Sequence, residues 1–142
     1  MISVPESFSI ALHALVLLAG KPGVYQSGTR IAEAYGFSAH HLSKVLASLA
    51  RAGLLESQRG PSGGVCFTLN PKDVTLAMIR DAVEGQAAPR KGCLLPIQAC
   101  PGKRCVVGCF LSKMEAEFQR IFKTTTLADI LRSIQKKGDN HV

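Results

Sequence analysis

The feature that most constrains this chain is a pair of short helical segments joined by a tight turn that begins with a glycine. The first covers residues 30–35 behind the possible N-caps Ser27 and Thr29, and Gly36 ends it. The second begins after Ser38, a good N-cap. Its apolar side chains recur at i, i+3, i+4 and i+7 as a single stripe: Leu42, Val45, Leu46 and Leu49. Two short helices joined by a tight glycine turn predict a helix-turn-helix.

The second of these helices has another face, which is polar, small and basic. It comprises His40, Ser43, Lys44 and Ala47. An α-helix fits the major groove of DNA. In a helix-turn-helix the early residues of the second helix are the ones that reach base edges. His and Ser side chains can donate or accept at bases or phosphates, whereas Lys44 suits a phosphate. The predicted DNA-binding residues of this helix are Ser38, His40, His41, Ser43 and Lys44.

A glycine-rich hairpin follows the two helices. Residues 54–59 predict one strand, residues 60–64 (Gly-Pro-Ser-Gly-Gly) a turn, and residues 65–69 the returning strand. Arg59 lies at the tip, where an arginine can enter a minor groove with its concentrated negative potential. A polar helix face alone is more often simply solvated. The succession of helix, turn, helix and hairpin is what favours DNA contact through this face and Arg59.

The remaining segments predict helices around this unit. Residues 8–19 are apolar on every side, as in a buried helix. Thr75 is expected to cap a helix over 76–84, and Thr126 with Asp129 forms a capping box before a last helix. Apolar residues at alternating steps of four and three predict the seam of a two-helix contact: Val107, Leu111, Met114, Phe118 and Ile121.

These elements predict a mainly α fold with a small β-hairpin wing (α+β), a winged helix-turn-helix followed by a long dimerisation helix. We expect one compact domain with three parts. Residues 1–85 form the winged helix-turn-helix, 86–105 a cysteine-bearing loop, and 106–135 the dimerisation and C-terminal helices. A structureless loop of this length is usually functional or disordered.

Net charge and the lack of membrane signals narrow the class of protein. The 142 residues include 17 Lys and Arg against 10 Asp and Glu, and this net charge of +7 favours a polyanionic partner. A hydrophobic content of 46% excludes a disordered tail and a coiled-coil rod. The apolar run over 8–19 is too short for a bilayer and lacks the basic residues of a signal peptide. We therefore expect a cytoplasmic protein with no membrane partner.

Four of the five cysteines lie close together, at Cys93, Cys100, Cys105 and Cys109. Residues 90–109 contain Lys and Arg but no acid, which favours thiolates, the ligands that zinc, copper(I) and iron-sulfur clusters prefer. The Cys-x2-Cys pairs of zinc sites and the ferredoxin spacings are both absent, so spacing alone leaves the metal open. Free thiols or a metal-free thiol sensor are the alternatives. Cys66, alone on a strand, predicts a small buried hydrophobe.

The chain resembles the Rrf2 family of winged helix-turn-helix transcription regulators, of the IscR and NsrR type. The resemblance lies in segments 46–49, 52–55 and 59–64 and in the cysteine loop. The resemblance covers about residues 7–133. It implies a homodimer that grips a palindromic operator in double-stranded DNA, with the long helix after the cysteine loop making the dimer contact. One departure is Val65, where many members have an aromatic residue. We expect it to alter the packing of the wing rather than the fold.

The resemblance also narrows the choice of metal centre. Cluster-binding members place three cysteines in this loop, which implies Cys93, Cys100 and Cys105 as ligands of an iron-sulfur cluster. The first gap is one residue longer than usual and the second one shorter, so both 2Fe-2S and 4Fe-4S stay open. The fourth ligand is Cys109, one helical turn after Cys105, or His13, because some members supply a ligand from the first helix across the dimer. Ser9 and Glu6 rank behind them.

The resulting functional prediction is a dimeric, sequence-specific DNA-binding transcriptional regulator whose operator binding is controlled by the cluster. The signal is redox state, nitric oxide or iron-sulfur status. The alternative is a metal-free regulator controlled by thiols or by a partner. A small iron-sulfur electron carrier ranks lower, because it leaves the helix-turn-helix and wing unexplained. The sequence has no nucleophile-base grouping and no phosphate-binding loop, and we predict that it is not an enzyme.

Overall fold

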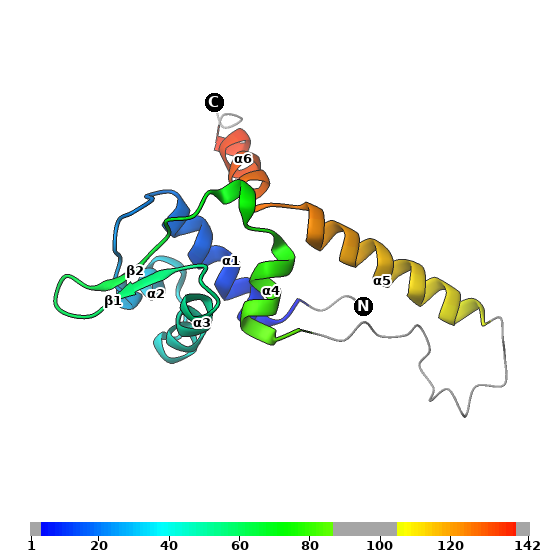
Figure 1. Ribbon diagram of the computed structural model, residues 1–142, viewed down its shortest axis with the longest axis horizontal. Coiled ribbons are helices and arrows are strands. Elements are labelled where there is room, and N and C mark those ends of the chain that lie inside the picture. Colours follow the sequence, from blue (N-terminus) through cyan, green and yellow to red (C-terminus); the bar gives the residue numbers. More distant parts are fainter. Residues whose placement is uncertain (1–3, 87–104, 139–142) are drawn as a thin grey trace.

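The computed structural model describes residues 4–86 and 105–138 of the chain (Figure 1). Over these residues it is mostly helical, with a single two-stranded antiparallel hairpin. The elements follow in this order: α1 (Glu6–Ala19), α2 (Gly28–Tyr35), α3 (Ala39–Arg51), β1 (Glu56–Gln58), β2 (Gly64–Cys66), the 3₁₀ helix η1 (Pro71–Asp73), α4 (Leu76–Glu84), α5 (Val106–Thr124) and α6 (Leu127–Gly138). This architecture confirms the predicted fold class.

Helix α1 forms the centre of the molecule and packs against α3, α4 and α6 (Figure 1). Its buried face includes Ile10, Leu15 and Leu18, each at most 2% exposed. The prediction of a buried helix is confirmed for this face, but the neighbouring helices leave the other side uncovered. His13 is exposed there, and Leu12 beside it is only half-buried. The first helix therefore has an accessible face.

The helix-turn-helix forms where the sequence predicts it, because its caps are local. The hydroxyl of Ser27 accepts the backbone N–H of Arg30 at 3.3 Å, so Ser27 rather than Thr29 caps α2. Gly36 ends α2 with a left-handed φ of 69°, a conformation that favours glycine. Ser38 accepts the N–H of His41 at 3.5 Å and starts α3. The turn between the helices thus has a fixed geometry.

The hairpin has shorter strands than predicted and is held by a third segment. Strands β1 and β2 pair over three residues each, with Ser57 opposite Val65. The expected extensions leave the ladder: Leu55 and Phe67 turn into the core, at 5% and 0% exposure. Val65 also exchanges two backbone hydrogen bonds of 2.9 Å with Gln26, in the connection between α1 and α2. The base of the wing is therefore fastened to the start of the helix-turn-helix.

The paired glycines of the wing are required by close backbone approaches. A Cβ on Gly63 would meet the carbonyl oxygen of Gln58 across the turn, and a Cβ on Gly64 would meet the carbonyl oxygen of Gln26. Gly64 also has a positive φ of 137°. Only a residue without a side chain allows the Gln26 segment to approach β2 this closely.

Helix α5 is attached to the rest of the molecule mainly at its C-terminal end. The N–H of Leu76 donates to the carbonyl of Thr125 at 3.0 Å, and the N–H of Leu127 donates to the carbonyl of Val74 at 2.8 Å. Phe122 is 9% exposed, and its ring centre lies 5.3 Å from that of Phe8 on α1. From this anchor α5 runs outward, so its N-terminal half extends away from the body (Figure 1).

The predicted seam of α5 is not covered within the chain. Val107, Met114 and Ile121 are 52%, 41% and 41% exposed, and Leu111 and Phe118 are half-buried. Most of the predicted loop 86–105 lies outside the described residues, and the three-part division of the chain stays a prediction. Over the part of the chain that the structure describes, no helix is both long and apolar enough to cross a membrane.

The fastening of the wing gives a stability prediction. Gly64→Ala should lower the free energy of unfolding by about 3 kcal/mol or more, because it adds a backbone clash to the strain of a positive φ. Gly60→Ala is the matched control, since its φ is 107° but nothing lies within 4 Å of an added Cβ. It should cost only about 1–2 kcal/mol. Urea unfolding measures both, and equal losses would contradict the close approach.

Candidate nucleic-acid interface and thiol site

The polar face of α3 is accessible along its length. His40, Ser43 and Lys44 are exposed, whereas the apolar stripe on the opposite side is buried in the core. The predicted N-cap Ser38 is exposed as well. Helix α3 therefore presents its predicted reading face to the exterior, held from behind by α1, α2 and α4.

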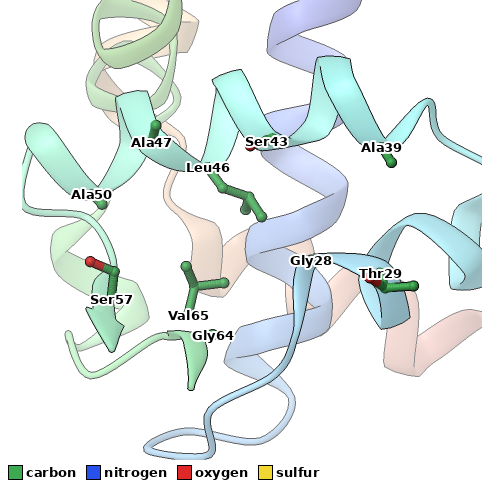
Figure 2. Close-up of a pocket in the computed structure, with 10 residues that line it drawn as sticks. All are labelled: Gly28, Thr29, Ala39, Ser43, Leu46, Ala47, Ala50, Ser57, Gly64 and Val65. Carbon is green, nitrogen blue, oxygen red and sulfur yellow. The ribbon is translucent and has the colours of Figure 1, made fainter. Parts of the chain in front are cut away.

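Beside this face lies a groove of about 470 Å³ between α3, the start of α2 and the hairpin (Figure 2). Its lining consists mostly of small residues: Gly28, Thr29, Ala39, Ser43, Leu46, Ala47, Ala50, Ser57, Gly64 and Val65. Figure 2 shows α3 along one side of it, opposite Gly28 and Thr29 of α2 and the two strands. Small side chains allow another molecule to come close to the backbone of all three elements.

Thr29 and Ser57 were not among the predicted site residues. Both residues line the groove. Thr29 carries a sequence signal only as a possible helix cap. Ser57 lies on the α3 side because it pairs with Val65, a register that the strand sequence alone does not specify. Both positions depend on how the wing docks on the helices.

His41 differs from the other predicted residues in its orientation. It is half-buried, and its Nδ1 lies 3.7 Å from Oε1 of Glu6 at the start of α1. His41 therefore contacts α1, whereas His40 and Lys44 on the same helix are exposed. A role of His41 at DNA stays a prediction.

The three elements that form the groove also carry exposed cationic side chains. Arg30 of α2, Lys44 of α3 and Arg59 of the wing turn are all exposed. Arg51, at the end of α3, donates to the hydroxyl of Ser48 at 3.1 Å. Positive charge on a face with a protruding hairpin matches the electrostatic requirement of a nucleic-acid surface.

A polar cluster supports the base of the wing from the other side. The hydroxyls of Tyr25 and Thr68 donate to the carboxylate of Glu56, at 3.4 and 2.9 Å. Hydrogen bonding to the thiol of Cys66 and partial burial raise the pKa of Tyr25, and the negative charge of Glu56 acts in the same direction. Cys66 itself is 1% exposed, which confirms the prediction of a buried hydrophobe.

The described cysteines of the predicted thiol site lie at the start of α5. Cys105 is the N-cap and Cys109 lies one turn later. The backbone N–H of Cys109 donates to the carbonyl of Cys105 at 2.9 Å. Both side chains are exposed. Sulfur is the soft donor that iron-sulfur clusters bind, so two exposed cysteines one helical turn apart fit the donor chemistry of such a cluster.

The other predicted cysteine ligands, Cys93 and Cys100, lie outside the described residues. Within residues 4–86 and 105–138, no three His, Cys, Asp or Glu side chains are grouped so as to hold a metal. The start of α5 lies well away from α1 (Figure 1). The described part of one chain therefore does not bring His13 together with Cys105 or Cys109.

His13 is exposed although it lies on the apolar first helix. Its Nδ1 lies 2.7 Å from the carbonyl oxygen of Ser9, and its ring packs edge-on against Tyr35 at 5.4 Å. An Nδ1–H that donates to this carbonyl leaves Nε2 as the unprotonated nitrogen that metals bind. The side chain is thus oriented and accessible.

Comparison with known proteins gives one family match over most of the chain. The model of the Rrf2 family, described as an iron-dependent transcriptional regulator, matches residues 4–133. All the predicted DNA-binding and metal-ligating residues fall within this range.

Relatives of known name are helix-turn-helix (HTH-type) transcriptional regulators. NsrR of Geobacillus kaustophilus is 33% identical over 109 residues, which cover 71% of this chain and 69% of that protein. BadM of Rhodopseudomonas palustris is 48% identical over 71 residues, or 50% of this chain and 46% of BadM. The chain spans about half the length of BadM. These names confirm the prediction of a regulator rather than an enzyme.

Solved structures support the same fold. The global cysteine regulator CymR of B. subtilis superposes with a TM-score of 0.75 at 23% identity, covering 94% of this chain and 98% of CymR. IscR of T. potens superposes with a TM-score of 0.73 at 25% identity, covering 96% of this chain and 90% of IscR. The arrangement of helices and wing is therefore shared with both regulators.

Proposed function

The chain belongs to the Rrf2 family of iron-dependent transcriptional regulators, and we propose that it is a homodimer whose binding to a palindromic operator is controlled by an iron-sulfur cluster. The observation that carries the DNA-binding part is the exposed polar face of α3 beside a groove whose far side is the wing. The small side chains that line the groove suit a close approach to the backbone of a duplex, and the exposed Arg30, Lys44 and Arg59 supply positive charge.

In this proposal α3 lies in the major groove and the wing in the adjoining minor groove. His40 and Ser43 are oriented for base edges, because they lie on the exposed face in the first turns of α3. Lys44 and Ser38 bind phosphates, and Arg59 enters the minor groove from the turn of the hairpin. His41 has a secondary role, since it contacts Glu6.

The exposed apolar face of α5 supports a dimer. Val107, Phe110 and Met114 are 52%, 59% and 41% exposed along the half of α5 that extends from the body. Apolar side chains at a four-three spacing are stable in water when a second helix covers them. A second copy of α5 meets this need, and a two-fold axis matches a palindromic operator.

The cysteine thiols before and at the start of α5 support the proposal of an iron-sulfur cluster. Cys93, Cys100 and Cys105 are the proposed ligands, with Cys109 or His13 as the fourth. When bound, an iron-sulfur cluster supplies a group whose charge and integrity respond to oxidants, nitric oxide or iron supply. Cys109 is favoured by its place one turn after Cys105. His13 is favoured by its exposed side chain and, because α1 lies well away from the start of α5 in the same chain (Figure 1), would act from the partner subunit.

A metal-free thiol regulator is the second candidate. Cys105 and Cys109 are exposed and one turn apart at the start of α5, so both thiols are accessible to an oxidant. In this case iron is not required. Oxidation of the two thiols would itself alter the start of α5, the proposed dimerisation helix.

The DNA contacts can be tested with two substitutions in α3. Lys44→Ala should weaken binding to every sequence and reduce the salt slope by about one unit, because it removes one phosphate contact. His40→Ala should change the preferred base at one operator position by about 1–3 kcal/mol. Fluorescence anisotropy at several salt concentrations measures both. Lys72→Ala, on η1, is the charge-matched control. If the α3 variants keep the salt slope and the base preference of the unaltered protein, α3 is not the helix that contacts the bases.

The cluster can be tested in anaerobically purified protein by its visible spectrum and its iron and sulfide content. If Cys109 is the fourth ligand, Cys109→Ala should lose iron while His13→Ala keeps the spectrum and the DNA response. If His13 is the ligand, the reverse pattern should appear. Cys66→Ala should retain its iron in either case, because Cys66 is buried away from the site. Absence of iron and sulfide from the unaltered protein would overturn the cluster and leave the thiol regulator.

A further inference from the structure

Arg80 of α4 is a charged side chain largely withdrawn from water, between the DNA-binding body and α5. Its side chain is only 13% exposed. Neither the DNA surface nor the thiol site uses it. A guanidinium is costly to bury unless its donors are satisfied, so its partners indicate what holds it there.

The partners of Arg80 come from both helices. Within α4, its Nε and Nη2 donate to Oδ1 of Asp81 at 3.0 and 2.8 Å. Toward α5, its Nη1 donates to Oε1 of Gln119 at 3.3 Å, and its Cζ lies 5.6 Å from the ring centre of Phe122. Arg80 therefore joins α4 to two successive turns of α5 by a hydrogen bond and a cation-π contact.

The two α5 partners are themselves held in place. The amide Nε2 of Gln119 donates to Oε1 of Glu115 at 2.8 Å, which orients its oxygen toward Arg80. The ring of Phe122 stacks on Phe118 at 4.2 Å and contacts Phe8 of α1. Because the guanidinium plane needs both partners in register, the contact resists rotation of α5 about its anchor.

The direction of α5 matters because of its length beyond this contact. The backbone hydrogen bonds Leu76–Thr125 and Leu127–Val74 fix only the C-terminal end of α5, and the helix leaves the body from there (Figure 1). Val106 lies about 20 Å from Gln119 along the axis at 1.5 Å per residue. A rotation of about 10° would move that end by about 3.5 Å, close to the rise of one base pair.

We propose that Arg80 is a positioning residue that fixes the angle of α5 against the DNA-binding body and thereby the spacing of operator half-sites that the dimer accepts. The inference rests on the proposed function, since spacing has meaning only for a dimer joined through α5. In a dimer of this kind the two α3 helices are separated by the body of each chain and by α5. A change of angle between them changes that separation while leaving each reading face intact.

The experiment selects binding sites from a random-sequence DNA duplex library with the full-length protein and an Arg80→Met variant. The unaltered protein should enrich paired half-sites at one spacing. The variant should enrich the same half-site over several spacings. Its discrimination against a spacer one base pair longer should fall about tenfold, the scale of one lost charge-assisted hydrogen bond. Its affinity for a single half-site should stay within about twofold, because distant sites act independently.

Two further variants keep the test decisive. Arg120→Met removes an arginine from α5 whose ion pair, within residues 4–86 and 105–138, is with Glu117 on the same helix at 2.6 Å, so it should keep the original spacing. Gln119→Leu removes the acceptor on α5 and should broaden the spacing even if Arg80→Met does not fold. A single unchanged spacing in both Arg80→Met and Gln119→Leu would overturn the proposal. If the unaltered protein enriches no paired half-sites, the dimeric function fails first and the role of Arg80 fails with it.

Discussion

The backbone pairing between Gln26 and Val65 is the constraint on which the DNA-binding surface depends. Without it the hairpin would be a short two-stranded ribbon, which is marginally stable in water. With it, β2 lies against the connection that leads into α2, and the groove forms between wing and α3. The approach is possible only because Gly64 has no Cβ. A single glycine thus links the geometry of the wing to that of the helix-turn-helix.

A second constraint joins this surface to the proposed dimer and sensor. Helix α4 packs on α1, α3 and α5, and Gly85 at its end leads into the segment that carries Cys93 and Cys100. Helix α5 begins at the other end of that segment, with Cys105 as its N-cap. The cysteine segment is therefore tied to the two helices that Arg80 joins.

The sequence predicted what is local and missed what depends on packing. The caps at Ser38, Thr75 and Thr126 were predictable because each rests on a bond to a residue three positions away. The exposure of His13 was not, since it depends on which side of α1 its neighbours leave open. The orientation of His41 toward Glu6 also depends on packing between distant segments. Ser57 lines the groove only because it pairs with Val65 in the hairpin, a register that its own sequence does not specify.

The central claim is that two copies of the chain, joined through α5, each place α3 and a wing on one half of an operator. Hydroxyl-radical footprinting of the unaltered protein on its selected duplex, with stoichiometry from sedimentation, tests it most directly. We expect two chains per duplex and two equal protected patches whose centres lie about one helical turn, or a whole number of turns, apart, at about 10 base pairs per turn. One chain per duplex with a single continuous patch would contradict the account.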